Sequence, residues 1–331
     1  MESGLLFIIT VIALAYIFEF VNGFHDAANS IATIVTTGVL TPRQAVIWAA
    51  FFNLIAFMVF NLMVANTIGR GLIETSIVDA PLVFSALIGA IFWNLVTWYY
   101  GLPSSSTHAL VGGLAGAALA KSGVTVLIPL GFIKVAIGIF VSPSIGIIMG
   151  LVLTFLFSYF LRYFSEVTFT KVFKGLQLIS SALLSLTHGG NDAQKTMGII
   201  AVLLFSSSML GDKFYVPYWV VISCQVVISL GTLAGGWRIV HTMGVKITEL
   251  NPMLGCAAET GAALMIFAAT HYGIPVSTTQ TVTGSIAGVG LYKGVKKTHW
   301  GILKRIFLSW LLTIPLAGMV SAAVMLMFFK G

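Results

Sequence analysis

Charged residues are scarce in this sequence, where Asp, Glu, Lys and Arg together make up 8% of the 331 residues. A soluble globular domain carries roughly 25% charged residues, so this chain cannot build a water-facing surface of the usual kind. Hydrophobic residues make up 58%, and the mean hydropathy is +1.02. The apolar runs are continuous rather than alternating, which favours membrane-spanning helices over a β-barrel. The length supplies about ten segments of the usual ~20 residues.

Cysteine is almost absent, and so are the signatures of nucleotide and metal chemistry. Cys224 and Cys256 both lie in apolar stretches and form neither a disulfide framework nor a metal-ligand spacing. No P-loop or dinucleotide-binding motif occurs, so we expect no cofactor, no metal site and an ion gradient as the energy source. The net charge of +7 comes from basic residues scattered between apolar runs, which argues against nucleic acid as a partner.

The sequence contains an internal duplication. Three landmarks recur in one order, the first after 166 residues and the others after 172: residues 23–27 as 189–193, residues 101–107 as 273–279, and residues 142–146 as 314–318. Matched landmarks in a fixed order indicate two homologous units. The sequence therefore predicts a first transmembrane repeat over 1–164 and a second over 165–331.

Each repeat is expected to hold the same elements. In the first repeat the apolar run 5–21 is interrupted by the polar motif 22–29, and a plain helix follows over 45–64. Two shorter apolar runs separated by Gly101-Leu102-Pro103 predict a re-entrant hairpin whose second arm starts at membrane depth. A last helix is expected beyond Pro143. The predicted fold class is an all-α polytopic membrane protein with interrupted helices and re-entrant hairpins.

The distribution of basic residues predicts the orientation. Three crossings per repeat give the two copies inverted topology. With both termini outside, eleven Lys and Arg residues fall inside and five fall outside, as the positive-inside rule requires. The basic segments 162–174 and 293–305 would then face the cytoplasm. We expect a multi-pass protein of the cell (inner) membrane.

Asp26 and Asp192 are carboxylates inside apolar runs, at matched positions of the two repeats. A charged side chain at the bilayer centre costs roughly 2.5–3.5 kcal/mol on insertion scales, so the duplicated pair indicates cation coordination or proton exchange. Asn29 follows Asp26 by three residues and so shares its helical face, and Lys195 holds the equivalent place after Asp192. The alternative is that both aspartates merely cap helix interruptions.

Two hydroxyl-rich strings each follow a proline suited to the first turn of a helix. They are Ser104-Ser105-Ser106-Thr107 and Val276-Ser277-Thr278-Thr279. Free main-chain N–H groups and the positive end of the helix dipole would then face the space between the repeats. Such a cradle suits a tetrahedral oxyanion. Alternatively, the hydroxyls only cap helices or link them to one another.

Other ionisable groups accompany these motifs. His25 adjoins Asp26 and can change charge near physiological pH, which makes it a candidate proton relay; the alternative is a hydrogen-bonded structural group. His108, His188 and His271 lie in or beside the same motifs. Glu19 and Glu259 also sit in apolar runs, but neither has a matched partner in the other repeat, so they rank below the aspartates.

The motifs resemble the paired signatures of the PiT inorganic phosphate transporters, in particular the bacterial low-affinity type. The likeness extends over nearly the whole chain and rests on residues 22–29, 187–195, 93–108 and 273–279. It implies symport of inorganic phosphate with protons or sodium ions. In some bacterial members the cargo is a neutral metal–phosphate complex. The family is also expected to form homodimers in the lipid bilayer.

The resemblance also implies roles by position. Coupling ions would be served by Asp26, Asp192, Asn29 and Asn191. Phosphate oxygens would be bound by Asn29, Ser105, Ser106, Asn191, Ser277, Thr278 and Thr279, with Lys195, Ser104 and Thr107 as secondary candidates. His25 stands where sodium-coupled members commonly carry Asn and where the proton-coupled bacterial type carries His, which favours protons. The long hydrophilic loop that many members insert between their halves is absent.

The leading hypothesis is thus an inverted-repeat phosphate symporter rather than an enzyme. A sulfate or other oxyanion permease on the same scaffold is the nearest alternative. An intramembrane enzyme that uses Asp26 and Asp192 as a carboxylate pair would need no sealed compartment. A passive anion channel would show no dependence on an ion gradient.

Overall fold

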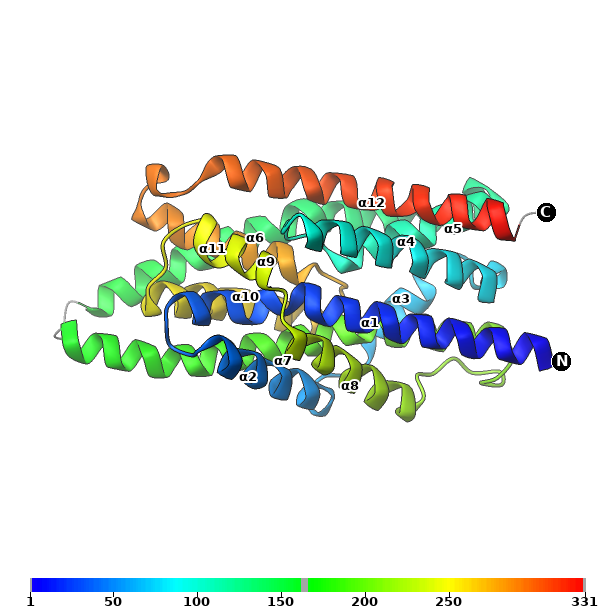
Figure 1. Cartoon of the computed structure of the whole chain (residues 1–331), viewed down its shortest axis with the longest axis horizontal. Coiled ribbons are helices and arrows are strands. Elements are labelled where there is room, and N and C mark those ends of the chain that lie inside the picture. The colour runs from blue at the N-terminus through cyan, green and yellow to red at the C-terminus, as the bar shows by residue number, and fades with distance from the viewer. Residues whose placement is uncertain (1, 162–165, 330–331) are drawn as a thin grey trace.

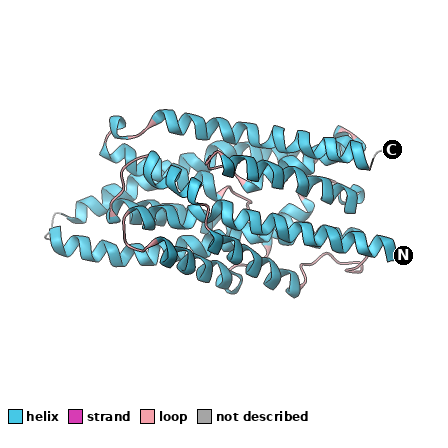
Figure 2. Ribbon diagram, viewed as in Figure 1, coloured by secondary structure: helices cyan, strands magenta, loops and turns pink. Residues whose placement is uncertain are grey.

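The regular elements of the described part of the chain are helices, as Figure 2 shows, apart from an isolated bridge between Ile73 and Leu127. The computed structural model describes residues 2–161 and 166–329. Five of its helices are long and apolar enough to cross a membrane, and two sharply bent helix pairs raise that number to as many as seven. The chain is therefore an all-α, multi-pass membrane protein.

The first half of the chain begins and ends with long helices. These are α1 (Glu2–Thr36) and α6 (Pro129–Leu161). Between them lie a bent pair and a hairpin: α2 (Pro42–Ile55), η1 (Ala56–Met58), α3 (Met63–Arg70), η2 (Thr75–Ile77), α4 (Ala80–Tyr99), α5 (Ser106–Ser122) and η3 (Val124–Val126). The α4–α5 hairpin turns back near the middle of the molecule in Figure 1.

The second half repeats this order in the opposite direction. Its elements are α7 (Glu166–Ser206), α8 (Tyr218–Ala234), α9 (Trp237–His241), η4 (Thr242–Lys246), α10 (Pro252–His271), α11 (Thr278–Lys293), η5 (Val295–Lys297) and α12 (Trp300–Phe328). In Figure 1, α1 starts at the end of the molecule where both termini lie, whereas α7 starts at the opposite end. The repeats thus have inverted topology. The expected boundary at 164/165 lies outside the described residues, as do Arg162 and Lys330 of the charge count.

The two hairpins pack crosswise, each against the last helix of the other half. The small residues of α5 and α11 permit this contact. A Cβ atom added at Gly116 would lie 2.0 Å from the carbonyl oxygen of Gly318 in α12, and one added at Gly288 would lie 2.2 Å from that of Ile147 in α6. Glycine at such contacts lets helix backbones approach closely in lipid. Each hairpin is therefore held by the opposite repeat.

The structure differs from the expected helix boundaries at three places, of which the first two are residues 22–29 and the start of α6. Helix α1 continues without a break through 22–29, because the polar side chains of this motif bond to neighbouring helices and leave the main-chain ladder intact. Helix α6 begins at Pro129 and includes Pro143. Proline is tolerated within membrane helices when neighbouring groups satisfy the freed carbonyl.

The interruption lies instead within the segment expected to be one helix, 45–64. Here α2 with η1 meets α3 at 83°, and in the second half α8 meets the α9–η4 segment at 63°. Gln194 of α7 occupies the first break. Its Oε1 accepts from the main-chain N–H groups of Val64 and Ala65 at 3.1 and 3.2 Å, while its Nε2 donates to the Asn61 carbonyl at 2.7 Å. The break is stable because one buried amide replaces the missing helical bonds.

Candidate functional site

The tips of the two hairpins lie near the centre of the molecule, beside the polar motifs of α1 and α7 (Figure 1). Gly101 and Gly273 turn the chain at the tips with φ of +63° and +68°, a region that favours glycine. Ser105 and Ser277 then cap α5 and α11. Each hydroxyl accepts from a main-chain N–H at 3.2 Å. Both second arms therefore begin within the duplicated strings, but Pro103 and Pro275 precede the capping residues and do not lie in the first turn, where they were expected.

Asp26 joins the two hairpins. Its Oδ2 accepts from Ser106 Oγ at 3.1 Å, and its Oδ1 accepts from Thr279 Oγ1 at 3.2 Å. The ring Nδ1 of His25 lies 2.7 Å from the same Oδ1, and the ring Nε2 lies 3.0 Å from Thr97 Oγ1. One carboxylate thus contacts both repeats, and an imidazole links it to α4.

Asp192 has a different set of partners. Its Oδ2 accepts from Thr278 Oγ1 at 2.9 Å and lies 3.2 Å from His188 Nε2. Its Oδ1 forms an ion pair with the ammonium of Lys195, which also donates to the Val276 carbonyl at 3.2 Å. The two aspartates are equivalent in sequence, but among the described residues only Asp192 is paired with an ammonium, whereas Asp26 is paired with the imidazole of His25.

The two asparagines keep acceptor groups free. Asn29 donates to Thr278 and Thr279 at 3.3 and 3.0 Å, and Asn191 donates to Thr270 at 2.8 Å. Both carboxamide oxygens are buried and have no hydrogen-bond partner among the described residues. A buried acceptor without a donor is costly, so these oxygens are available ligand groups for a cation or a protonated anion.

The fold brings the two aspartates together. One carboxylate oxygen each of Asp26 and Asp192 and one ring nitrogen of His188 lie within 4.8 Å of one another, all in buried side chains. Such a set could hold a small cation, although the sequence motivated no metal site. The acidic and basic groups that meet here are two carboxylates, the imidazoles of His25 and His188 and the ammonium of Lys195.

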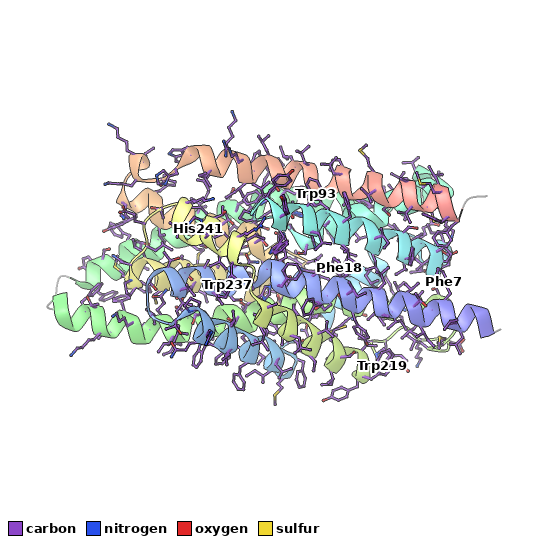
Figure 3. All side chains as sticks on the ribbon, viewed as in Figure 1. Phe7, Phe18, Trp93, Trp219, Trp237 and His241 are labelled. Atoms are coloured by element: carbon purple, nitrogen blue, oxygen red, sulfur yellow. The ribbon has the colours of Figure 1, made fainter. Side chains whose placement is uncertain are left out.

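Some of the expected phosphate ligands have other partners. Ser104 lies 2.8 Å from Thr313 of α12, which also accepts from the indole N–H of Trp93 at 3.0 Å; Trp93 is labelled in Figure 3. The hydroxyls of Ser105 and Ser277 cap their helices, and Thr107 is buried in the first turn of α5. Ser106, Thr278 and Thr279 are the hydroxyl residues that reach the aspartates.

Several buried polar residues around the site carry weaker sequence signals. Asn53 contacts His188 Nδ1 at 3.2 Å and donates to Thr232 at 2.8 Å. In the sequence, Asn53 stands out only as an amide residue within the apolar segment 45–64. Glu19 accepts from Thr196, and Glu259 accepts from Thr33 at 2.5 Å and Gln177 at 3.0 Å. These unmatched acids are buried, but their partners lie outside the hairpin tips.

Comparisons with known proteins agree with this architecture. Residues 22–321 match the model of the Phosphate transporter family. A probable low-affinity inorganic phosphate transporter of Rhizobium meliloti (strain 1021) is 55% identical over 324 residues, 97% of each chain. One from Bacillus subtilis (strain 168) is 40% identical over the same length and coverage.

A solved structure of a phosphate transporter is also similar to this chain, at a lower sequence identity. This structure, "The sodium-dependent phosphate transporter", superposes with a TM-score of 0.86 at 27% identity. The likeness covers 96% of this chain and 98% of that one. In sequence and in fold, this chain belongs to the Phosphate transporter family.

Proposed function

We propose that the chain is a secondary active symporter that binds inorganic phosphate between the two hairpin tips, near the membrane midplane. The observation that carries the proposal is the pair of buried carboxylates, Asp26 and Asp192, which lie close together beside the single ammonium of Lys195. Burying a further negative charge there without compensation is strongly unfavourable. Phosphate can therefore enter only together with a cation, and this requirement couples the two movements.

Donors for the anion come from the hairpins. Helices α5 and α11 begin at the site, and their N-termini direct free N–H groups and a partial positive charge towards it. Ser106, Thr278 and Thr279 supply hydroxyls that now donate to carboxylates. Each can turn towards a phosphate oxygen once a cation occupies the aspartates. The same donors would accept sulfate, so selectivity between the two anions is part of the test.

A proton is the favoured coupling ion. His25 contacts both Asp26 and Thr97, so an imidazole is placed to exchange protons with the carboxylate. Sodium is the second candidate. The solved relative is described as a sodium-dependent phosphate transporter, and the carboxylate and amide oxygens around Asp26 are ligands that suit hard cations.

Uptake of labelled phosphate into proteoliposomes, with pH and sodium gradients imposed separately, tests the proposal. We expect a pH gradient alone to drive accumulation, and His25→Asn to flatten the pH dependence or shift coupling towards sodium. Uptake that requires sodium and does not respond to a pH gradient would identify sodium as the coupling ion. Equilibration without accumulation under either gradient would instead indicate a passive channel.

Further arms of the same assay address cargo and assembly. Excess sulfate should compete weakly if phosphate is the substrate, and omission of divalent cations should abolish uptake if the cargo is a metal–phosphate complex. We also propose a homodimer in the inner membrane, which chemical cross-linking in native membranes can detect. The family and the relatives are transporters, which sets aside the intramembrane enzyme.

A further inference from the structure

Asn29 and Lys195 occupy equivalent positions with different chemistry. Each lies three residues after the aspartate of its repeat, and each side chain points towards the tip of the second hairpin. Asn29 presents a neutral amide to Thr278 and Thr279. Lys195 presents an ammonium. The two repeats therefore match in their aspartates but differ at the position three residues later, where one has a neutral amide and the other an ammonium.

The Lys195 ammonium lies among ligands of the kind that hold an alkali cation. It is bound by a carboxylate oxygen of Asp192 and by the main-chain carbonyl of Val276, directly before the N-cap of α11. Carboxylates together with carbonyls of non-helical backbone coordinate coupling ions at interrupted helices in transporters. The side chain is 3% exposed, so solvent does not share in this coordination.

No ammonium of the described residues is in direct contact with Asp26, although Asp192 lies close by. The described partners of Asp26 are two hydroxyls, Ser106 and Thr279, and the ring of His25. The carboxamide oxygen of Asn29 is nearby in sequence and unpartnered. A mobile cation at Asp26 would therefore find a carboxylate and free oxygens, whereas at Asp192 it would meet the ammonium.

We propose that the Lys195 ammonium is a resident cation, which permanently fills one of two equivalent cation positions and leaves only the position beside Asp26 for an exchangeable coupling ion. The inference rests on the proposed symport. Because the lysine is tethered to α7, its charge helps to neutralise phosphate but is never released. The chain then needs one coupling ion fewer than a symmetric site would.

Replacement of Lys195 by the residue of the other repeat tests this role. Lys195→Asn removes the charge and supplies an amide oxygen, so the second position should become a true cation site. Without sodium, we expect phosphate affinity to fall roughly a hundredfold, since a buried carboxylate has lost its partner. High sodium should restore it, and uptake should show one additional sodium dependence. Lys195→Met, which supplies no ligand oxygen, should stay inactive at every sodium concentration.

Controls separate this effect from a general loss of charge. Lys121→Asn removes another lysine, which forms an ion pair with Asp79 at 2.6 Å and lies far in sequence from Asp26 and Asp192. This variant should leave the cation dependence of phosphate uptake unchanged. The reciprocal Asn29→Lys places an ammonium beside Asp26. We expect this variant to bind phosphate without any added cation and to lose accumulation. It provides an independent test if Lys195→Asn does not fold.

The outcomes distinguish the two proposals. Wild-type protein that fails to accumulate phosphate under any gradient refutes the symport. Accumulation by wild type together with an unchanged cation dependence in Lys195→Asn overturns the resident cation and leaves the symport standing. A folded Lys195→Asn protein that is inactive even at high sodium also overturns it, because the lysine would then do what a bound cation cannot.

Discussion

At the scale of single residues, the site is a small set of buried charges whose balance depends on a few contacts. Asp26 lies at 2% exposure and Asp192 at 1%. Neither is solvated, so each depends on hydroxyls, imidazoles or Lys195 for stabilisation. Residues that look interchangeable in the duplicated motifs have different partners here, and single substitutions can test whether their roles differ.

Removal of either buried carboxylate should abolish coupled transport. Asp26→Asn and Asp192→Asn keep the side-chain shape but remove the charge that attracts the cation. We expect uptake under an imposed gradient to fall to background while folded protein persists in the membrane. Asp212→Asn, in the exposed loop after α7, is the matched control and should transport normally. Near-normal uptake by either buried variant would show that the coupling ion binds elsewhere.

Neighbouring serines of one hairpin tip should give different phenotypes. Ser105 caps α5, so Ser105→Ala should lower stability by about 0.5–2 kcal/mol. Ser106 donates to Asp26, so Ser106→Ala should weaken phosphate binding more than it lowers the Tm. The loss should be modest, because the main-chain N–H groups of α5 remain. Thermal shift measurements with and without phosphate report both the stability and the phosphate binding of each variant. Equal effects of Ser105→Ala and Ser106→Ala would contradict the separate roles predicted for the two serines.

At the scale of elements, the hairpins are held by close helix contacts rather than by large side chains. Gly112 and Gly116 of α5 meet α12, and Gly284 and Gly288 of α11 meet α6. The spacing of four residues recurs in both arms, as small-residue stripes do in membrane helix pairs. The position of each tip, and hence of Ser106, Thr278 and Thr279, depends on these contacts.

A single methyl group in this contact should displace a hairpin. In Gly116→Ala, the new Cβ would meet the main chain of Gly318 at 2.0 Å, and backbone cannot rotate away. We expect a destabilisation of about 1–3 kcal/mol, typical of overpacking, with reduced phosphate binding. Gly138→Ala in α6 is the control, because nothing lies within 4 Å of its added Cβ. If Gly116→Ala had the same Tm as the control, moving α5 away from α12 would cost no free energy, and the prediction would be wrong.

At the scale of the whole molecule, inverted repeats place both termini at one end (Figure 1). The loop between α7 and α8 lies at the same end as the termini, and the loop between α11 and α12 lies at the other. The positive-inside rule predicts that the second of these loops faces the cytoplasm. The repeats interlock through their hairpins, so neither forms a separate body beside the other.

Cysteine labelling of intact cells should establish the orientation. Cys224 and Cys256 are buried and can be replaced to give a cysteine-free background. In that background, we expect Lys213→Cys, in the α7–α8 loop, to react with an impermeant reagent. Lys296→Cys, between α11 and α12, should react only after permeabilisation. The reverse pattern would place the termini in the cytoplasm and refute the predicted orientation.

Much of the architecture could be predicted from the sequence, because hydropathy and duplication are properties of the linear chain. Scarce charge specifies helices in lipid, the repeated strings specify two copies, and an odd number of crossings per copy implies that the copies are inverted. The same strings locate the hairpin tips and single out Asp26 and Asp192. The hydroxyl strings predicted the starts of α5 and α11, because capping by Ser105 and Ser277 depends on neighbouring residues, although the prolines lie outside the first turn.

Only the tertiary structure decided which polar groups meet. Thr279 and Asp26 are 253 residues apart, and no local pattern encodes their contact. A polar motif resembles a helix interruption when the partners of its side chains are unknown, so a break was expected within 22–29, where α1 is in fact continuous. The true break, at residues 59–62, depends on Gln194 of another helix. The charge asymmetry of Asn29 and Lys195 is visible in sequence, but its place within a shared site follows from packing alone.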